Sequence, residues 1–367
     1  MGNIRQVIKM AAQNIVLPLV YRSAGGSQVD RDLVVFADAH HDSRPENMEL
    51  LRQQLEKDFK IRECYLDTGK AGAGTTFRFM RDFMKLYAKA GTVVICDNFL
   101  PVASCKKKQQ TRVVQLWHAC GALKKFGYDT EDDIPANYRG NVFQNIDLVT
   151  VSSEACIEPF ASAMKRRKDQ VQALGVSRSD RFLDDAWNER CRRQFYEAYP
   201  QAKGKKVVLW APTFRGSAGD PLLGDFDLDS LQKELGEDYL VLARLHPHME
   251  KKFGTGNCSI PTDELFPVTD VLIADYSSLI YEYLLYGKAL VKYTPDYDTY
   301  TAKRGFYHPY EEIPGSWVRR QDELAQAVRE ADTPANAEKQ KAFLNKFMSA
   351  CDGHATERIA EWIREHR

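Results

Sequence analysis

The sequence has no run of apolar residues long enough to cross a membrane. A spanning helix needs about 20 consecutive apolar residues, and no stretch of this 367-residue chain approaches that length. The N-terminal apolar stretch is interrupted by Pro18 and lacks a clean small-residue cleavage site, so it does not predict a secretory signal. Internal repeats and low-complexity tracts are also missing, which excludes solenoid and largely disordered architectures.

Net charge and paired cysteines are missing as well. The 51 basic residues balance 51 acidic ones, so the basic field of a nucleic-acid binder is absent and no nucleic-acid partner is expected. The eight cysteines stand singly, with no Cys-x-x-Cys pair and no histidine at zinc spacing. They predict reduced thiols in a cytoplasmic protein, and no metal site.

Basic residues gather into three runs in the first half of the chain, at 106–108, 124–125 and 165–168. Each run alone is typical of a solvated loop or helix face. Three of them in one half favour a face that meets anionic lipid or a pyrophosphate.

The sequence does contain two successive series of strands and helices. With 44% apolar and 28% charged residues it is typical of a globular protein, and its length fits two domains. Short apolar runs predict strands at 33–36, 61–66, 93–95, 113–116 and 148–151, and again at 207–210, 240–243, 271–274 and 289–293. Alternation with helices predicts parallel sheets covered on both faces. We expect an α/β fold of two Rossmann-like domains, over 27–175 and 176–345, and a C-terminal helix over 346–367.

The N-terminal segment, residues 1–26, is predicted to be an amphipathic helix and linker. Its apolar residues recur at helical spacing: Ile4, Val7, Ile8, Ala11 and Ile15. Arg5 and Lys9 lie off that face and could reach lipid headgroups. We expect the segment to associate with the membrane surface; the alternative is a helix packed on the core of the protein itself.

Polar motifs follow the predicted strands, where open parallel sheets bind their ligands. The first motif, over 117–127, begins just after the strand at 113–116. Its His118 could accept a proton near neutral pH, and Lys124 and Lys125 supply charge for a phosphate. A lone histidine is more often structural, but this context favours a catalytic one.

Two further motifs place arginines directly after strands. Thr213 and Arg215 belong to the motif at 211–215, where the guanidinium offers a two-pronged hydrogen-bond donor for phosphate or carboxylate. Arg244 and His246 alternate along an extended segment, so both could reach one phosphate. An ion pair at a domain edge is the alternative for that second pair.

The last motifs follow the strands at 271–274 and 289–293. Asp275 ends its strand, and a helix is predicted from about Ser278 to Tyr286, so Ser277 and Ser278 mark an anion-binding helix start or a simple cap. Glu282, one turn further on, could bind ribose hydroxyls. Arg304 opens a short motif at 304–307 that predicts a loop.

Taken together, these motifs resemble the CDP-glycerol glycerophosphotransferase family of teichoic-acid synthesis. The family pattern combines a Trp-His element before two lysines with Ala-Pro-Thr-Phe-Arg, Arg-x-His-Pro, Asp-Tyr-Ser-Ser and Arg-Gly-Phe-Tyr elements. All five occur here in that order, from Trp117 to Tyr307, and the tail at 352–358 is similar to the closing segment of the family.

The resemblance implies a GT-B-like fold with the active site between two domains, and CDP-glycerol bound mainly by the C-terminal domain. It implies His118 as the base, and His246 as a second catalytic residue beside the donor phosphates. The donor-binding set would be Thr213, Arg215, Arg244, Asp275, Ser277, Ser278 and Glu282. Lys124, Lys125 and Arg304 would face the acceptor or a phosphate, and no cofactor or metal is expected.

The motif after His118 departs from the form in the long polymerases of the family. Ala119-Cys120-Gly121-Ala122 stands where those chains usually read Gly-Thr-Pro, and this form is similar to the primase branch, as is the chain length. The implied reaction transfers glycerol phosphate from CDP-glycerol to an undecaprenyl-diphosphate-linked disaccharide, releasing CMP. The implied location is the cytoplasmic face of the membrane, peripherally bound to an anionic surface.

Two other interpretations of the sequence stay open, and a third is disfavoured. One is a polyol-phosphate polymerase of teichoic acid or capsule. Another is a GT-B nucleotide-sugar glycosyltransferase, which would release UDP or GDP instead of CMP. A non-catalytic membrane scaffold is disfavoured, because His118 and the phosphate-binding set are present.

Overall fold

The computed structural model describes residues 11–26, 28–131, 133–134, 138, 140–213, 215–217, 220–222, 226–245, 249 and 252–367. It divides into two compact units. The first consists of Met1–His118, Phe126–Asp180 and Ala350–Arg367, and the second of Ala119–Lys125 and Arg181–Ser349. The main division falls after Asp180, close to the expected boundary at 175–176. The short stretch Ala119–Lys125, expected in the first domain, belongs to the second unit.

The first unit is built on a six-stranded parallel sheet in the order β2-β1-β3-β4-β5-β6. Its strands are β1 Asp30–Asp38, β2 Lys60–Tyr65, β3 Ala90–Ile95, β4 Arg112–Gln115, β5 Leu148–Thr150 and β6 Val171–Gln172. Its helices are α2 Leu17–Ala24, α3 Glu46–Leu55, α4 Ala73–Tyr87, α5 Leu100–Ala103, α6 Ile157–Met164 and α15 Ala355–Glu365. The central strand β3 is wholly buried and apolar except for Thr92, as expected of a sheet covered on both faces.

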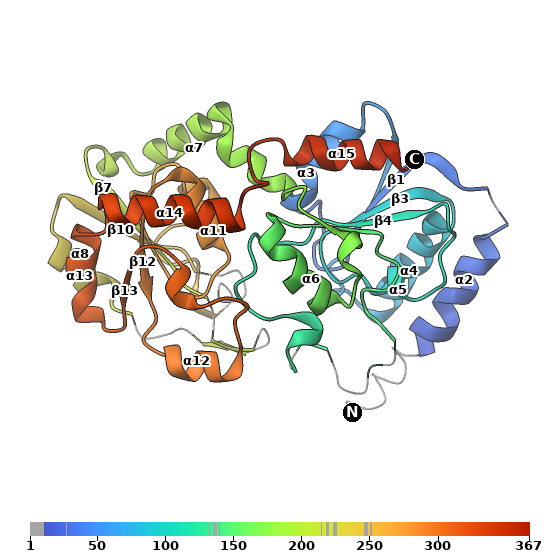
Figure 1. Ribbon diagram of the computed structural model, residues 1–367, viewed down its shortest axis with the longest axis horizontal. Coiled ribbons are helices and arrows are strands. Elements are labelled where there is room, and N and C mark those ends of the chain that lie inside the picture. Colours follow the sequence, from blue (N-terminus) through green and yellow to red (C-terminus); the bar gives the residue numbers. More distant parts are fainter. Residues whose placement is uncertain are drawn as a thin grey trace. The chain divides into compact units, whose positions relative to one another are not determined.

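The C-terminal helix α15 belongs to this first unit. Figure 1 shows it beside α3, and Ile359, Ala360 and Ile363 are buried in the same apolar cluster as the α3 side chains. The Asp180 carboxylate accepts hydrogen bonds from the backbone N–H groups of Ala355 (3.0 Å) and Thr356 (2.7 Å). That carboxylate therefore satisfies amides that the first turn of a helix leaves unpaired.

The second unit is built on a five-stranded parallel sheet in the order β10-β7-β11-β12-β13, with a separate antiparallel pair, β8-β9. The strands are β7 Lys206–Ala211, β8 Arg215–Ser217, β9 Asp220–Leu222, β10 Tyr239–Ala243, β11 Val271–Ala274, β12 Ala289–Tyr293 and β13 Ser316–Val318. The helices are α7 Asp185–Ala198, α8 Leu228–Leu235, α10 Thr262–Leu265, α11 Leu279–Tyr283, α12 Tyr297–Lys303, α13 Leu324–Arg329 and α14 Pro334–Phe347. Helices α8 and α13 contribute to the apolar core beside this sheet.

These two parallel α/β units confirm the fold class expected from the alternation of strands and helices. Within the described ranges, no helix combines the length and apolarity needed to cross a bilayer. In the N-terminal segment, residues 1–10 lie outside the described residues. Leu17 and Tyr21 of α2 are buried against the first unit, whereas Ile15 (59% exposed) and Leu19 (57%) face outward.

Candidate active site

His118 stands at the carboxyl edge of the first sheet, directly after β4. The residue before it, Trp117, has a φ of 56°, in the left-handed region that a bulky residue rarely adopts. Two side chains hold this turn: Gln115 accepts from the Trp117 N–H (3.0 Å), and Asn47 donates to the Trp117 carbonyl (2.9 Å). The turn projects the imidazole outward, so that 47% of its side chain is exposed.

The His118 ring has an aromatic neighbour on one side and a carboxylate on another. The Trp117 ring stacks on it at 4.3 Å between centroids. Asp97 Oδ2 lies 3.4 Å from Nδ1 of His118. Desolvation lowers the pKa of His118, and the Asp97 charge opposes this in part. A lowered pKa keeps the ring neutral near pH 7, which is the form a general base needs.

The residues after His118 belong to the second unit and pack on its last motif. Lys125 N donates to Gly305 O (2.9 Å), and Tyr307 N donates to Leu123 O (2.9 Å). The backbones of Lys124 and Phe306 form an isolated antiparallel β-bridge. The structure thus brings Lys124 and Lys125 together with Arg304, whose Nε donates to Lys125 O (3.2 Å).

Gly121 allows this loop to approach the rest of the second unit closely. Its φ is 66°, and a Cβ there would lie 2.2 Å from the Tyr281 ring. Tyr281 in turn makes a 2.6 Å hydrogen bond with His308 Nε2. Only glycine meets both demands, the left-handed backbone and the lack of space.

Arg215 sits in a network of carboxylates in the second unit. Its Nη1 donates to Asp275 (2.8 Å), and its Nε (2.5 Å) and Nη2 (3.0 Å) donate to Asp296. Thr213 donates to Asp275 through its N–H (3.0 Å) and its hydroxyl (2.9 Å). Three of the expected donor-binding residues, Thr213, Arg215 and Asp275, are therefore brought together. Their hydrogen bonds run mostly to one another and to Asp296.

Aromatic rings and a second carboxylate complete the surroundings of Arg215. Burial raises the pKa of Asp296, and the hydrogen bonds and charge of Arg215 outweigh that effect and leave it below its usual value. The Tyr276 ring stacks on Tyr300 at 3.8 Å, and the guanidinium of Arg215 lies 5.1 Å from the Tyr276 centroid. Asp296 and Tyr300 were not singled out from the sequence, because nothing in their spacing links them to Arg215. Tyr276 entered only as a member of the Asp-Tyr-Ser-Ser element, with no role of its own.

The serines of the fourth motif precede a short helix. Ser278 is the N-cap residue of α11, and within the described part of the chain its side chain makes no capping hydrogen bond. Ser277 Oγ accepts weakly from Leu279 N at 3.4 Å. Glu282 is buried, with its Oε1 3.5 Å from Cys120 Sγ, so it faces the loop after His118.

The remaining expected residues lie at the end of β10. Arg244 N donates to Trp210 O (2.9 Å), and its Nη1 reaches Thr255 O at 3.4 Å. His246 lies outside the described residues, so its catalytic role stays a prediction. Among the residues that the structure describes, no group of three or more His, Cys, Asp or Glu is arranged to hold a metal ion.

The fold is GT-B-like, with two parallel α/β units that carry polar motifs after their strands. The model of the CDP-glycerol:poly(glycerophosphate) glycerophosphotransferase family matches residues 19–365. The chain therefore belongs to that family, and it is a polyol-phosphate transferase. This confirms the resemblance drawn from the five motifs.

Two relatives and one solved structure show how far the similarity extends. The chain is 33% identical to a teichoic acid ribitol-phosphate primase of Bacillus spizizenii, over 91% of each chain. It is 29% identical to a teichoic acid glycerol-phosphate primase of Bacillus subtilis, over 74% of this chain and 73% of that one. The wall teichoic acid polymerase TagF shares the fold, with a TM-score of 0.77 at 22% identity, covering 99% of this chain and 96% of that structure.

Proposed function

We propose that this enzyme transfers one glycerol phosphate from CDP-glycerol to a hydroxyl of an undecaprenyl-diphosphate-linked disaccharide, as a priming step of wall teichoic acid synthesis. The observation that carries the priming role is the similarity to primases. The chain is 33% identical to a teichoic acid ribitol-phosphate primase over 91% of this chain, and 29% identical to a teichoic acid glycerol-phosphate primase over 74% of it.

In this mechanism, His118 removes the proton of the acceptor hydroxyl as its oxygen attacks the β-phosphorus of CDP-glycerol. The bond from that phosphorus to the bridging oxygen breaks, and CMP leaves. Phosphoryl transfer depends chiefly on positioning and on neutralising charge. Arg244, His246, Ser277 and Ser278 would supply hydrogen-bond donors to the diphosphate, and we expect no metal to be required.

Ribitol phosphate is the second candidate for the transferred unit. It is favoured by the 33% identity to a ribitol-phosphate primase. The donor CDP-glycerol is supported by the family itself and by a TagF structure soaked with CDPG.

The expected product carries a single added unit. The enzyme is incubated with a synthetic lipid-linked disaccharide and either CDP-glycerol or CDP-ribitol, with and without EDTA, and the products are analysed by mass spectrometry. We expect a mass gain of one glycerol phosphate, unchanged by EDTA. A ladder of masses would indicate a polymerase, a gain only from CDP-ribitol would change the donor, and loss of turnover restored by magnesium would contradict the metal-free mechanism.

We further propose that the enzyme binds peripherally to the cytoplasmic face of the membrane through its N-terminal segment. Ile15 and Leu19 are exposed there, while Leu17 and Tyr21 anchor the same segment to the first unit. Burying two such side chains in the interface stabilises binding by a few kcal/mol.

The double variant Ile15→Asp/Leu19→Asp should therefore lose binding to vesicles that contain anionic lipid. A flotation assay measures the bound fraction, and the matched control is Leu183→Asp, which replaces another exposed apolar residue. If the double variant floats with the vesicles as the parent enzyme does, the segment is not the membrane anchor.

A further inference from the structure

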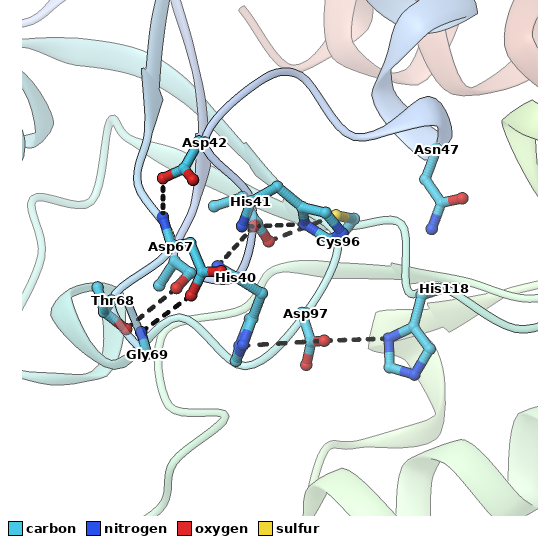
Figure 2. A network of polar contacts seen from close by, with 12 residues as sticks. His40, His41, Asp42, Asn47, Asp67, Thr68, Gly69, Cys96, Asp97 and His118 are labelled. Carbon is cyan, nitrogen blue, oxygen red and sulfur yellow. Dashed lines mark hydrogen bonds and ion pairs between the residues drawn. The ribbon is translucent and has the colours of Figure 1, made fainter. Parts of the chain in front are cut away.

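Asp97 lies at the same sheet edge as His118, just after β3. Its Oδ2 is 3.4 Å from His118 Nδ1 and 4.0 Å from His40 Nε2. Figure 2 shows the carboxylate between the two rings. The side chain is 30% exposed, so the interaction is partly shielded from solvent.

We propose that Asp97 is a positioning residue for His118, holding the proton of the neutral ring on Nδ1 so that Nε2 is the atom that accepts the proton. This inference rests on the proposed function, in which His118 is the base. It identifies Nε2 as the nitrogen that accepts the proton, and Asp97 as a residue that acts on the reaction through the His118 ring.

The chemistry of the two groups supports this assignment. An ionised carboxylate can only accept hydrogen bonds, so it favours the tautomer whose N–H points at it. The Nε2 lone pair is then free to take the proton of the acceptor hydroxyl. Once it has done so, the ring is a cation with a proton on each nitrogen, and the ionised Asp97 stabilises that cation.

The backbone around His118 is also built to fix the ring. Trp117 has a left-handed backbone, which is strained for a residue with a bulky side chain. Asn47 holds the Trp117 carbonyl, and Arg178 Nη1 in turn donates to Asn47 Oδ1 (3.0 Å). Strain of this kind persists where surrounding contacts hold it, and it is concentrated at functional sites.

Among the described residues, neighbouring groups of the first unit shift the pKa of the ring. Desolvation has the largest effect and lowers the pKa of His118. The Asp97 charge and the Cys96 carbonyl raise this pKa, whereas Arg178 and His40 lower it. Removing the Asp97 charge therefore lowers this pKa further. His118 then stays neutral down to a lower pH. The acid limb of the pH–rate profile therefore moves to lower pH, and the rate on the plateau of that profile falls.

The test is the Asp97→Asn variant. We expect kcat to fall about 10²-fold, because the asparagine no longer fixes the tautomer or stabilises the cation, with KM for the donor little changed. Asp97→Glu, which keeps the charge, should restore part of the rate. The matched control is Asp42→Asn, whose carboxylate accepts from Asp67 N (2.9 Å) and makes no contact with His118 in the described network.

A second readout does not depend on turnover. Nitrogen-15 NMR of the histidine rings, with the His118 signal assigned from a His118→Gln variant, reports the tautomer and the pKa directly. We expect the Nδ1–H form in the parent enzyme, and a mixed tautomer with a lower pKa in Asp97→Asn. An unchanged tautomer and pH profile would overturn the inference, whereas absence of product from the parent enzyme would count against the proposed function instead.

Discussion

Replacing His118 with alanine is expected to reduce turnover by about 10² to 10⁴, the usual contribution of general base catalysis. The ring is half-exposed at the carboxyl edge of its sheet and carries a lowered pKa. Without it, the hydroxyl proton loses its acceptor in this mechanism. The measurement is kcat with saturating donor and acceptor.

His41→Ala is the matched control for this experiment. That ring lies at the same sheet edge and is also exposed, but it bonds to Asp38 (2.8 Å). We expect near-parental turnover from it. A His118→Ala enzyme that works at the parental rate would remove the base from the mechanism.

Replacing Arg215 with methionine is expected to destabilise the second unit by about 3 kcal/mol. The substitution keeps an apolar stem but leaves Asp275, which is 5% exposed, without its cationic partner. Removing one member of a buried ion pair leaves an uncompensated charge, which costs more than the pair itself contributed. Urea unfolding followed by circular dichroism measures the loss.

Arg320→Met is the control, because its pair with Asp322 is well exposed and should matter little. Unchanged unfolding of Arg215→Met together with a raised KM for the donor would instead support the phosphate-binding role expected from the sequence.

The strands were predictable because their signal is local. The apolar run at 113–116 corresponds to β4 Arg112–Gln115, and those at 271–274 and 289–293 correspond to β11 and β12. The helix expected from Ser278 to Tyr286 was only partly right. It ends as α11 at Tyr283, and a 3₁₀ turn, Leu284–Tyr286, follows before Gly287 at a φ of 65°.

The partners within the site were not predictable, because they depend on tertiary contacts. Asp97 meets His118 only once β3 and β4 pair in register. Asp296 reaches Arg215 from 81 residues away in the chain. The left-handed backbone of Trp117 has no sequence signal either, because tryptophan rarely adopts it.

Transfer of glycerol phosphate from CDP-glycerol is tested most directly by the identity of the nucleotide released when the acceptor gains mass. The enzyme is given CDP-glycerol and UDP-activated sugars together with the lipid-linked disaccharide, and the nucleotides are separated by chromatography. One CMP is expected for each acceptor molecule that is extended. Release of UDP, with CDP-glycerol left intact, would contradict it.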